Sequence, residues 1–190
     1  MDSLWCQNIN FPTFSSLDGN KNTDALVLGG GIAGILCAYA LKQAGVDVIL
    51  VEAKRISGGV TQNTTAKITS QHGLIYNKLL TKFGTERASQ FLRANQEAIE
   101  KYRDLCSGID CDFQEKDAFL YSLNSKHTLE GELNALVHLG YSADLVEELP
   151  LPFPTAGGIR FPNQAQFHPL KFLSAIAQKL TIYENTKVLE

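Results

Sequence analysis

The sequence has no apolar run long enough to cross a bilayer, no excess of basic residues and few cysteines. None of its apolar stretches approaches the roughly 20 residues that span a hydrocarbon core. The formal net charge of −3 gives no reason to expect a nucleic acid or an anionic membrane as a partner. Residues 1–23 lack the basic and apolar regions of a secretory signal, and we interpret them as an irregular N-terminal arm. With 44% hydrophobic residues, the 190-residue chain can bury a core, so a globular protein of the cytoplasm is expected.

The four cysteines are Cys6, Cys37, Cys106 and Cys111. No two of them form a C-x-x-C pair, and no histidine stands at zinc-finger spacing, so no metal site is predicted. Cys37 falls within the first expected helix and is interpreted as small core filler. Cys106 and Cys111 are close enough in sequence for a disulfide, but without a secretory signal reduced thiols are the favoured state.

A strand–helix–strand unit follows the arm. Residues 24–28 form a short apolar run typical of a buried parallel strand, and residues 46–51 form a second, β-branched run. Between them, residues 32–44 are apolar and rich in small side chains, and Gly45 stands at a favourable helix C-cap position. The pattern predicts a right-handed βαβ unit.

The turn between the first strand and the helix carries a nucleotide-binding pattern. Residues 29–34 read GGGIAG, which fits G-x-G-x-x-G, and Glu52 stands 23 positions after Gly29, at the end of the second strand. In this motif Gly29 permits the tight turn and Gly31 leaves room for a pyrophosphate beside the backbone. Gly34 lets the helix pack against the strand. Together these features predict a dinucleotide site.

The polar groups of this turn indicate which dinucleotide fits. The N–H groups of Gly31, Ile32 and Ala33 are expected to point at the phosphates, where the helix dipole also favours negative charge. Glu52 is expected to accept hydrogen bonds from ribose hydroxyls. Because its carboxylate would repel a 2′-phosphate, NADP is a poor candidate.

The residues after Glu52 favour FAD over NAD. Arg55 is followed by Ser, Gly and Thr at residues 57–61 and by NTTAK at residues 63–67. Small residues allow this backbone to lie close to a ligand, and the hydroxyls offer donors along a ribityl-pyrophosphate. Arg55 would either add charge near the phosphates or stack on the adenine. The alternative interpretation of the stretch is a solvated, turn-rich loop.

The remaining chain alternates helices and extended segments. Helices are expected over 74–83, 85–106, 129–139 and 170–180, the last with Pro169 at its first position. Two strands are expected around a turn at residues 115–117, and a pair of extended segments over 149–167. Residues 181–190 are expected to be extended.

Four stretches carry a family resemblance: LVLGGGIAGILCAYALKQAGVDVILVEA, GGVTQNTTAKITSQHGLIY, NQAQFHPLKFLSAIA and IYENTKVLE. Over residues 24–190 the chain resembles the D-amino-acid-oxidase-like family of FAD-dependent oxidoreductases. It is similar to glycine and sarcosine oxidases in plan, and closest to a bacterial branch in which a C-terminal Rieske domain follows the flavin module.

The resemblance implies a fold, a cofactor and a site. The expected fold is α/β, a Rossmann-like three-layer FAD-binding domain with a parallel sheet and an inserted α+β substrate domain, both incomplete. The expected parts are residues 24–111 and 167–190 for FAD and residues 112–166 for substrate. The implied FAD-binding residues are Gly29, Gly31, Ile32, Ala33, Gly34, Glu52, Arg55, Thr64, Thr65, Ala66 and Val188.

The implied activity is hydride transfer from an amine or amino acid, a CH–NH donor, to the flavin. Because members of the family need roughly twice this length, the chain resembles an N-terminal fragment, inactive by itself, whose partner is the remainder of the polypeptide with a [2Fe–2S] Rieske domain. No catalytic residue is assigned. Arg160 is a candidate for substrate carboxylate, and structural roles are favoured for His72 and Tyr121. The alternatives are an NAD-binding dehydrogenase lobe and a non-catalytic nucleotide-binding module.

Overall fold

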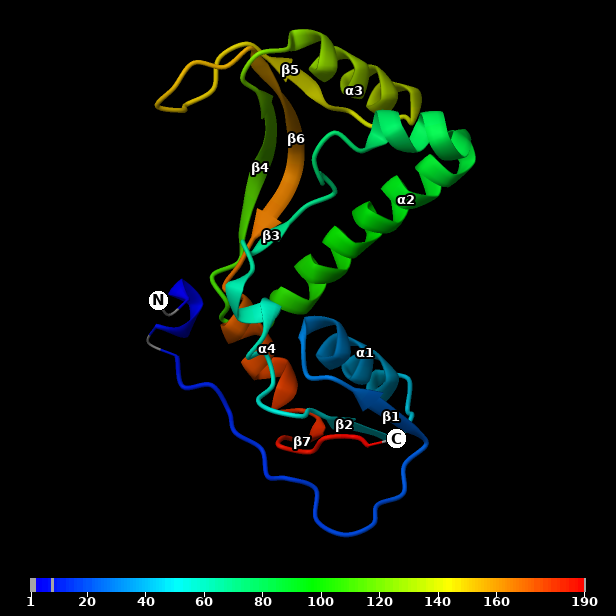
Figure 1. Cartoon of the computed structure of the whole chain (residues 1–190), viewed down its shortest axis with the longest axis vertical. Coiled ribbons are helices and arrows are strands. Elements are labelled where there is room, and N and C mark those ends of the chain that lie inside the picture. The colour runs from blue at the N-terminus through cyan, green and yellow to red at the C-terminus, as the bar shows by residue number, and fades with distance from the viewer. Residues whose placement is uncertain (1–2, 8, 190) are drawn as a thin grey trace. The chain divides into compact units, whose positions relative to one another are not determined.

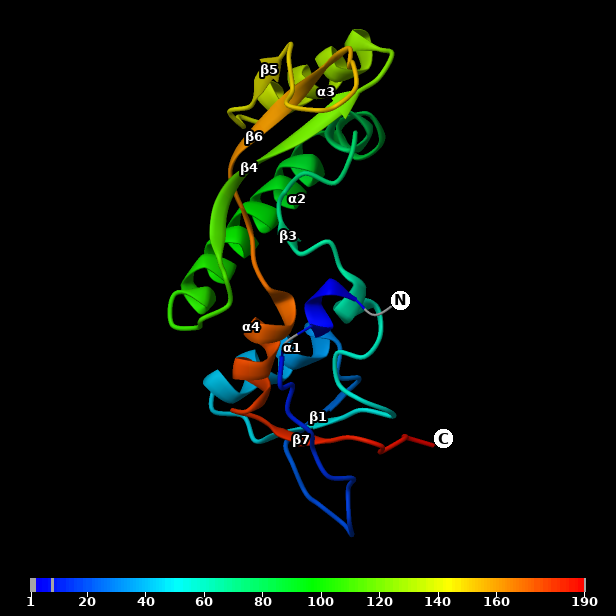
Figure 2. The same cartoon turned by 90° about the vertical axis from the view of Figure 1, so that its left-hand side faces the viewer.

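The computed structural model describes residues 3–7 and 9–189, and the chain divides into two compact units. The first unit contains the N-terminal part to residue 66, residues 109–112 and the chain from residue 167. The second contains residues 67–108 and 113–166. Figures 1 and 2 give two views of the elements of each unit. Among the described residues, no helix is long and apolar enough to cross a membrane.

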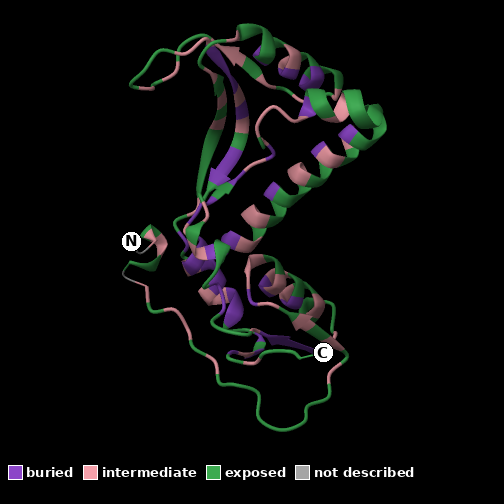
Figure 3. Ribbon diagram, in the orientation of Figure 1, coloured by how far each residue is buried: buried purple, intermediate pink, exposed green. Residues whose placement is uncertain are grey.

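The first unit is built on a three-stranded parallel sheet in the order β1-β2-β7. Its elements are η1 Leu4–Cys6, β1 Ala25–Leu28, α1 Ile32–Gln43, β2 Val48–Val51, η2 Val60–Asn63, α4 Pro169–Ala177 and β7 Thr181–Tyr183. The predicted βαβ unit is confirmed as β1, α1 and β2. All four residues of the central strand β2 are buried, as is typical of the middle strands of parallel sheets (Figure 3).

The helices α1 and α4 contact each other and lie on one face of this sheet (Figure 1). They provide two layers, helix on sheet, of the expected three-layer arrangement. The helix α4 begins as predicted, with Pro169 in the first turn. His168 is its N-cap, and its ring Nδ1 accepts a hydrogen bond from the N–H of Lys171 at 3.2 Å. On α1, Cys37 is exposed, so its interpretation as core filler is wrong, and all four cysteines are thiols.

The second unit is an antiparallel sheet with two helices. Its elements are β3 Lys67–Ile68, α2 Tyr76–Cys106, β4 Gln114–Ser122, α3 Lys126–His138, β5 Asp144–Val146 and β6 Gly157–Gln166. The strand β6 pairs with β4 along one edge and with β3 and β5 along the other. The helix α2 is broken at Gly84, where φ is 78°, which confirms the two predicted helical segments on either side.

This unit differs from the sequence expectation in two strands. Residues 114–122 form one strand, not two, because the charged Glu115, Lys116 and Asp117 occupy exposed strand positions. The pairing with β6 shifts register between Lys116 and Ala118, so the irregularity is a bulge rather than a turn. Likewise, the expected pair of extended segments over 149–167 contains one strand, β6. Its Pro162, which has no N–H, lies opposite that shift.

The division into units also places α2 differently from the expected domain boundaries. Residues 67–108 were expected in the FAD-binding part, residues 24–111, whereas they lie in the unit of the antiparallel sheet. The reason is packing, because Tyr76 and Leu92 of α2 share a buried cluster with Leu129 of α3 and Phe161 of β6. The boundary expected at residue 166 coincides with a change of unit.

A buried carboxylate caps the long helix α2. Glu132 of α3 is 1% exposed. Its Oε1 accepts hydrogen bonds from the N–H groups of Ile75 (2.9 Å) and Tyr76 (2.8 Å), and its Oε2 accepts one from Asn77 (2.9 Å). The N-cap residue of α2 supplies no side-chain hydrogen bond of its own. The charge of Glu132 therefore satisfies donors at the helix N-terminus, where the dipole also favours an anion.

We expect Glu132→Gln to destabilise the fold. The amide keeps one acceptor oxygen but turns an NH₂ group toward one of the three N–H donors, which should cost about 1–3 kcal/mol of unfolding free energy. Urea unfolding followed by circular dichroism measures this. Glu130→Gln, on the exposed side of the same helix, is the matched control, and equal midpoints for the two variants would contradict the capping role.

The N-cap of α4 predicts a pH dependence. Burial, together with the positive charge of Lys171, lowers the pKa of His168 below its ordinary value, although Asp112 partly opposes this. The unfolded imidazole therefore takes up a proton more readily than the folded one, so stability is complete above about pH 6.5 and falls as the pH drops toward the folded pKa. His168→Asn keeps a side-chain acceptor without titrating. Unfolding midpoints measured from about pH 7.5 to about pH 5 should lose this component in the variant.

Candidate nucleotide site

The first unit contains a cavity of about 820 Å³ at the carboxyl ends of β1 and β2. This edge of a parallel sheet is where ligands bind in open α/β folds. The wall comes from the glycine turn, from the loop after β2, from α4 and from the N-terminal arm. The lining residues are Cys6, Ile9, Phe11, Gly30, Gly31, Glu52, Lys54, Arg55, Ile56, Ser57, Gly58, Gly59, Val60, Thr61, Gln62 and Leu170.

Three glycines of the turn are required by the protein itself. Gly29 has φ of 102°, a conformation that L side chains rarely adopt. A Cβ on Gly30 would lie 2.4 Å from Cγ2 of Ile56, and a Cβ on Gly34 would lie 1.9 Å from the carbonyl oxygen of Gly29. The last contact would be with a backbone oxygen, so no rotamer change could relieve it. These glycines therefore fix the approach of α1 to the turn.

Gly31 is different, because no protein atom requires a glycine there. Its backbone is extended, and a Cβ would meet only Oγ1 of Thr61, at 3.5 Å, which is an ordinary contact. Gly31 lines the cavity. The space beside it is consequently open, as a pyrophosphate lying against the backbone needs.

The Glu52 carboxylate is already oriented by backbone donors. Its Oε2 accepts the N–H of Gly30 and its Oε1 accepts the N–H of Lys54, both at 2.8 Å. Each carboxylate oxygen keeps further acceptor capacity. Since Glu52 lines the cavity, it can accept hydroxyl donors from a ribose without changing its position.

The N-terminus of α1 has one donor satisfied by the loop. Its N-cap, Gly31, supplies no side-chain hydrogen bond, and the N–H of Ile32 donates instead to Oγ1 of Thr61 at 3.1 Å. The expectation that the Ile32 N–H points freely at a phosphate is thus modified, because Thr61 occupies that donor. The sequence indicated Thr61 only as one of the hydroxyls of residues 57–61, and the fold of the loop after β2 brings it to the helix.

Ser57 also marks the cavity wall as polar. It is 4% exposed, has φ of 58°, and its Oγ makes no hydrogen bond to any described residue. A buried hydroxyl without a partner is costly in a folded protein, and left-handed backbone at a non-glycine residue is uncommon. Together with the space at Gly31 and the Glu52 carboxylate, this donor fits a polar, phosphate-containing ligand.

Arg55 lines the cavity, but its charge is paired. Its Nη1 lies 3.0 Å from Oε2 of the fully buried Glu184, and its Nη2 donates to the carbonyl of Pro12 at 3.2 Å. The guanidinium therefore holds protein segments together at the edge of the cavity. The sequence left two roles open for Arg55 and did not identify Glu184 at all.

The other predicted cofactor residues lie outside the cavity wall. Thr64 is the C-cap of η2, and its carbonyl accepts a hydrogen bond from the indole N–H of Trp5 at 2.8 Å. Thr65 is exposed, and Ala66 is buried with φ of 56°. Val188 is 52% exposed in the segment after β7. Their contacts with a cofactor stay a prediction.

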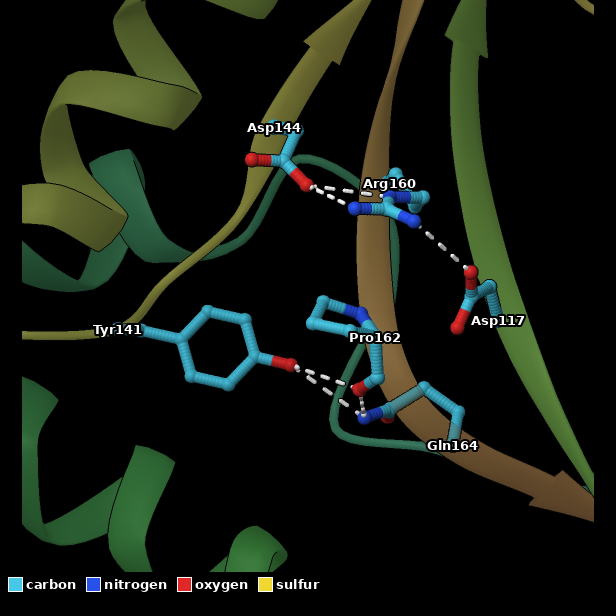
Figure 4. A network of polar contacts seen from close by, with 6 residues as sticks. All are labelled: Asp117, Tyr141, Asp144, Arg160, Pro162 and Gln164. Atoms are coloured by element: carbon cyan, nitrogen blue, oxygen red, sulfur yellow. Dashed lines mark hydrogen bonds and ion pairs between the residues drawn. The ribbon is translucent and has the colours of Figure 1, made fainter.

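In the second unit, Arg160 is engaged with two aspartates rather than free for a substrate carboxylate (Figure 4). Its Nε donates to Oδ2 of Asp144 at 3.1 Å, and its Nη1 lies 3.3 Å from Oδ2 of Asp117. Hydrogen bonding to Asp144 raises the pKa of the Arg160 guanidinium. The arrangement is a cross-strand ion-pair cluster on neighbouring strands, and its net charge is negative.

Figure 4 also shows a polar contact between Tyr141 and Gln164. The amide of Gln164, 1% exposed, donates to the hydroxyl of Tyr141 at 3.3 Å and to the carbonyl of Pro162 at 2.7 Å, and its Oε1 accepts the N–H of Ser70 at 2.8 Å. Burial raises the pKa of Tyr141. Gln164 lies on β6 between the residues that pair with β3 and those that pair with β5. Its hydrogen bonds therefore have a structural role.

The structure also places the remaining residues considered from sequence. His72 is exposed and forms a hydrogen bond of 3.0 Å with Asn95 of α2. Tyr121 packs against Phe153, with ring centroids 5.9 Å apart. Both contacts are consistent with structural roles. Within residues 3–7 and 9–189, no group of three or more His, Cys, Asp or Glu is arranged to hold a metal ion.

Comparison with known proteins agrees with this geometry. Residues 24–190 match the sequence pattern of the DAO family, described as FAD dependent oxidoreductase. The chain is 36% identical to the "Putative Rieske 2Fe-2S iron-sulfur protein YhfW" of Bacillus subtilis (strain 168), covering 100% of this chain and 39% of that protein. It is 27% identical to the gamma-glutamylputrescine oxidoreductase of Escherichia coli (strain K12), covering 63% of this chain and 29% of that protein.

Solved structures show the same fold. The L-proline dehydrogenase of P. horikoshii superposes with a TM-score of 0.71 at 17% identity, covering 89% of this chain and 46% of that one. The glycine oxidase of Bacillus cereus ATCC 14579 superposes with a TM-score of 0.64 at 19% identity, covering 89% and 48%. The expected fold class is confirmed. The chain spans less than half the length of each of these relatives.

We expect alanine substitutions at Gly34 and Gly31 to differ in their effect on the free energy of unfolding. Gly34→Ala should destabilise the fold by about 1–3 kcal/mol or more, because its Cβ meets the Gly29 carbonyl. Gly31→Ala should change the unfolding free energy by no more than about 0.5 kcal/mol, yet Gly31→Val should abolish FAD binding by filling the pyrophosphate space. Urea unfolding and FAD titration measure the two effects. A Gly31→Val protein that binds FAD as the unaltered chain does would show that the phosphates lie elsewhere.

Proposed function

The chain belongs to the DAO family of FAD-dependent oxidoreductases, and we propose that the cavity of its first unit holds the adenosine diphosphate half of FAD. The observation that carries this proposal is the open space at Gly31, the one turn glycine that neither a protein contact nor a left-handed backbone requires. The pyrophosphate would lie there, against the N-terminus of α1. The ribose hydroxyls would donate to Glu52, whose carboxylate is held by Gly30 and Lys54.

The loop after β2 would complete the phosphate site. Ser57 offers a buried hydroxyl without a partner, and Thr61 would exchange its bond with the Ile32 N–H for a contact with a phosphate oxygen. We assign Ala33 and the turn glycines to the same pyrophosphate. Thr64, Thr65, Ala66 and Val188 stay candidates for the remainder of the cofactor, because they follow the cavity-lining loop and β7.

For the reaction we propose oxidation of an amine or amino acid. When bound, FAD would supply the acceptor for a hydride from a CH–NH carbon, which leaves the donor as a protonated imine. Support comes from relatives whose names state such donors, namely glycine oxidase, L-amino acid deaminase and gamma-glutamylputrescine oxidoreductase. The contribution of this chain is cofactor binding, and no catalytic residue is assigned to it.

We further propose that the antiparallel sheet of the second unit is the first part of a substrate domain. In that sheet Arg160 is neutralised by Asp117 and Asp144, so it does not serve as the reader of a substrate carboxylate. A Rieske domain, as named for the B. subtilis relative, is proposed as a partner carried by the same polypeptide.

The 190-residue chain should bind FAD and ADP with similar affinity. Its cavity contacts only the half that the two ligands share, so their dissociation constants should agree within about threefold, and FMN, which lacks the ADP half, should not compete. Titration followed by flavin fluorescence, with ADP and FMN as competitors, tests this. Strong competition by FMN, or no binding of FAD, would contradict the proposed site.

Glu52→Ala should weaken FAD binding while the chain stays folded. Loss of the carboxylate removes charge-assisted bonds from the ribose hydroxyls, each worth roughly 1.5–3 kcal/mol. Asp47→Asn, an exposed carboxylate at the opposite end of β2, is the matched control. An unchanged FAD dissociation constant in Glu52→Ala would refute the ribose assignment.

A further inference from the structure

Glu184, directly after β7, is a buried carboxylate that the FAD assignment does not use. It is 0% exposed. Its Oε1 accepts the N–H of Ile56 at 2.8 Å, its Oε2 accepts the N–H of Phe14 at 3.0 Å, and the guanidinium of Arg55 lies 3.0 Å from Oε2. A buried charge is tolerated only with such partners. The buried Glu184 carboxylate therefore depends on three contacts, one with the N-terminal arm and two with the loop after β2.

Further hydrogen bonds from backbone N–H groups fasten the same three segments. The N–H of Glu184 donates to the carbonyl of Ser15 at 3.1 Å, and the N–H of Leu17 donates to Oγ1 of Thr186 at 2.9 Å. On the other side, the N–H of Thr186 donates to the carbonyl of Glu52 at 2.9 Å. The chain after β7 thus joins the N-terminal arm to the loop that carries the ribose-binding carboxylate.

The beginning of the arm is attached to the cavity loop by separate contacts. The indole N–H of Trp5 donates to the carbonyl of Thr64 at 2.8 Å, and its ring meets His168 edge-on with centroids 5.2 Å apart. The hydroxyl of Ser3 donates to the carbonyl of Gln62. Along the arm, Ile9 and Phe11 stand between Trp5 and the residue that Glu184 contacts, Phe14, and both line the cavity.

Polar anchors and partly covered apolar side chains together hold the arm in place. Among its described residues, 3–7 and 9–23, none is fully buried (Figure 3), but Trp5, Ile9, Phe11 and Phe14 are only partly exposed. Their partial burial adds to the polar contacts, of which Glu184 is the best buried. Replacing Glu184 by Gln would remove the charge that pairs with Arg55 and would turn an NH₂ group toward either the Phe14 N–H or the Ile56 N–H, because the amide keeps only one acceptor oxygen.

We propose that the arm is a wall of the nucleotide cavity and that Glu184 is the positioning residue that holds it there. Ile9 and Phe11 supply apolar surface on the same cavity that Glu52 and Gly31 line, which suits the adenine base of the ligand. The proposal rests on the proposed binding of the ADP half of FAD. It adds a contribution from outside the G-x-G-x-x-G unit to affinity for that half.

Trp5, the one tryptophan of the sequence, reports on the arm. In the 190-residue chain without nucleotide, Glu184→Gln should increase quenching of Trp5 emission by acrylamide about twofold or more, because an arm released at Phe14 keeps only the contacts of Ser3 and Trp5, which then open more often. The same variant should raise the dissociation constants of ADP and FAD about tenfold. Asp18→Asn, an exposed carboxylate in the same arm, should change neither quantity.

A second variant keeps the test valid if Glu184→Gln fails to fold. Ile9→Ala with Phe11→Ala leaves the anchors intact and lies outside the buried core, so the variant should stay folded at about 25 °C while the ADP dissociation constant rises about threefold or more. Unchanged ADP and FAD affinity in the double variant, or in a folded Glu184→Gln, would overturn the arm proposal alone. If the unaltered chain binds neither ADP nor FAD, the proposed function fails and this inference fails with it.

Discussion

The close contact between Gly34 and the carbonyl of Gly29 is the constraint on which the first unit depends. A Cβ at position 34 would lie 1.9 Å from that oxygen, so α1 can start where it does only because the side chain is missing. The start of α1 directs its N-terminus toward the cavity and sets the place where Thr61 meets Ile32. At Gly30 a Cβ would lie 2.4 Å from Cγ2 of Ile56, so the same close packing extends to the loop after β2. The cavity is the space left beside this turn.

Buried carboxylates join segments that regular secondary structure does not connect. Glu132 closes the N-terminus of α2 from the neighbouring helix α3, and Glu184 joins the N-terminal arm to the loop after β2. In both cases one side chain accepts hydrogen bonds from backbone donors far away in sequence, which makes the desolvation of a charge tolerable. Because each carboxylate serves several donors, its loss disturbs more than one segment.

The sequence predicted what is local and missed what is long-range. The βαβ unit, the break at Gly84 and the start of α4 after His168 each depend on residues within one or two turns, and each was confirmed. The strand β4 was predicted as two strands, because a charged triplet resembles a turn when its exposed strand positions are not visible. Glu184 gave no local signal, and Thr61 was noted only among the hydroxyls of residues 57–61, not as the partner of α1. Their partners are 128 and 29 positions away, and only tertiary structure brings them together.

The geometry of the cavity also indicates how a ligand would be accommodated. Glu52 is held by two backbone N–H groups before any ribose arrives, so binding adds hydrogen bonds without reorienting the carboxylate. Such preorganisation reduces the cost of ordering side chains on binding. Thr61 differs, because in the proposed function its bond to the Ile32 N–H is exchanged for a phosphate oxygen. For the Ile32 N–H, that exchange would replace a neutral acceptor by a charged one, which forms the stronger hydrogen bond. In this proposal the ribose end is prepared in advance, whereas the phosphate end gains its contacts from the ligand.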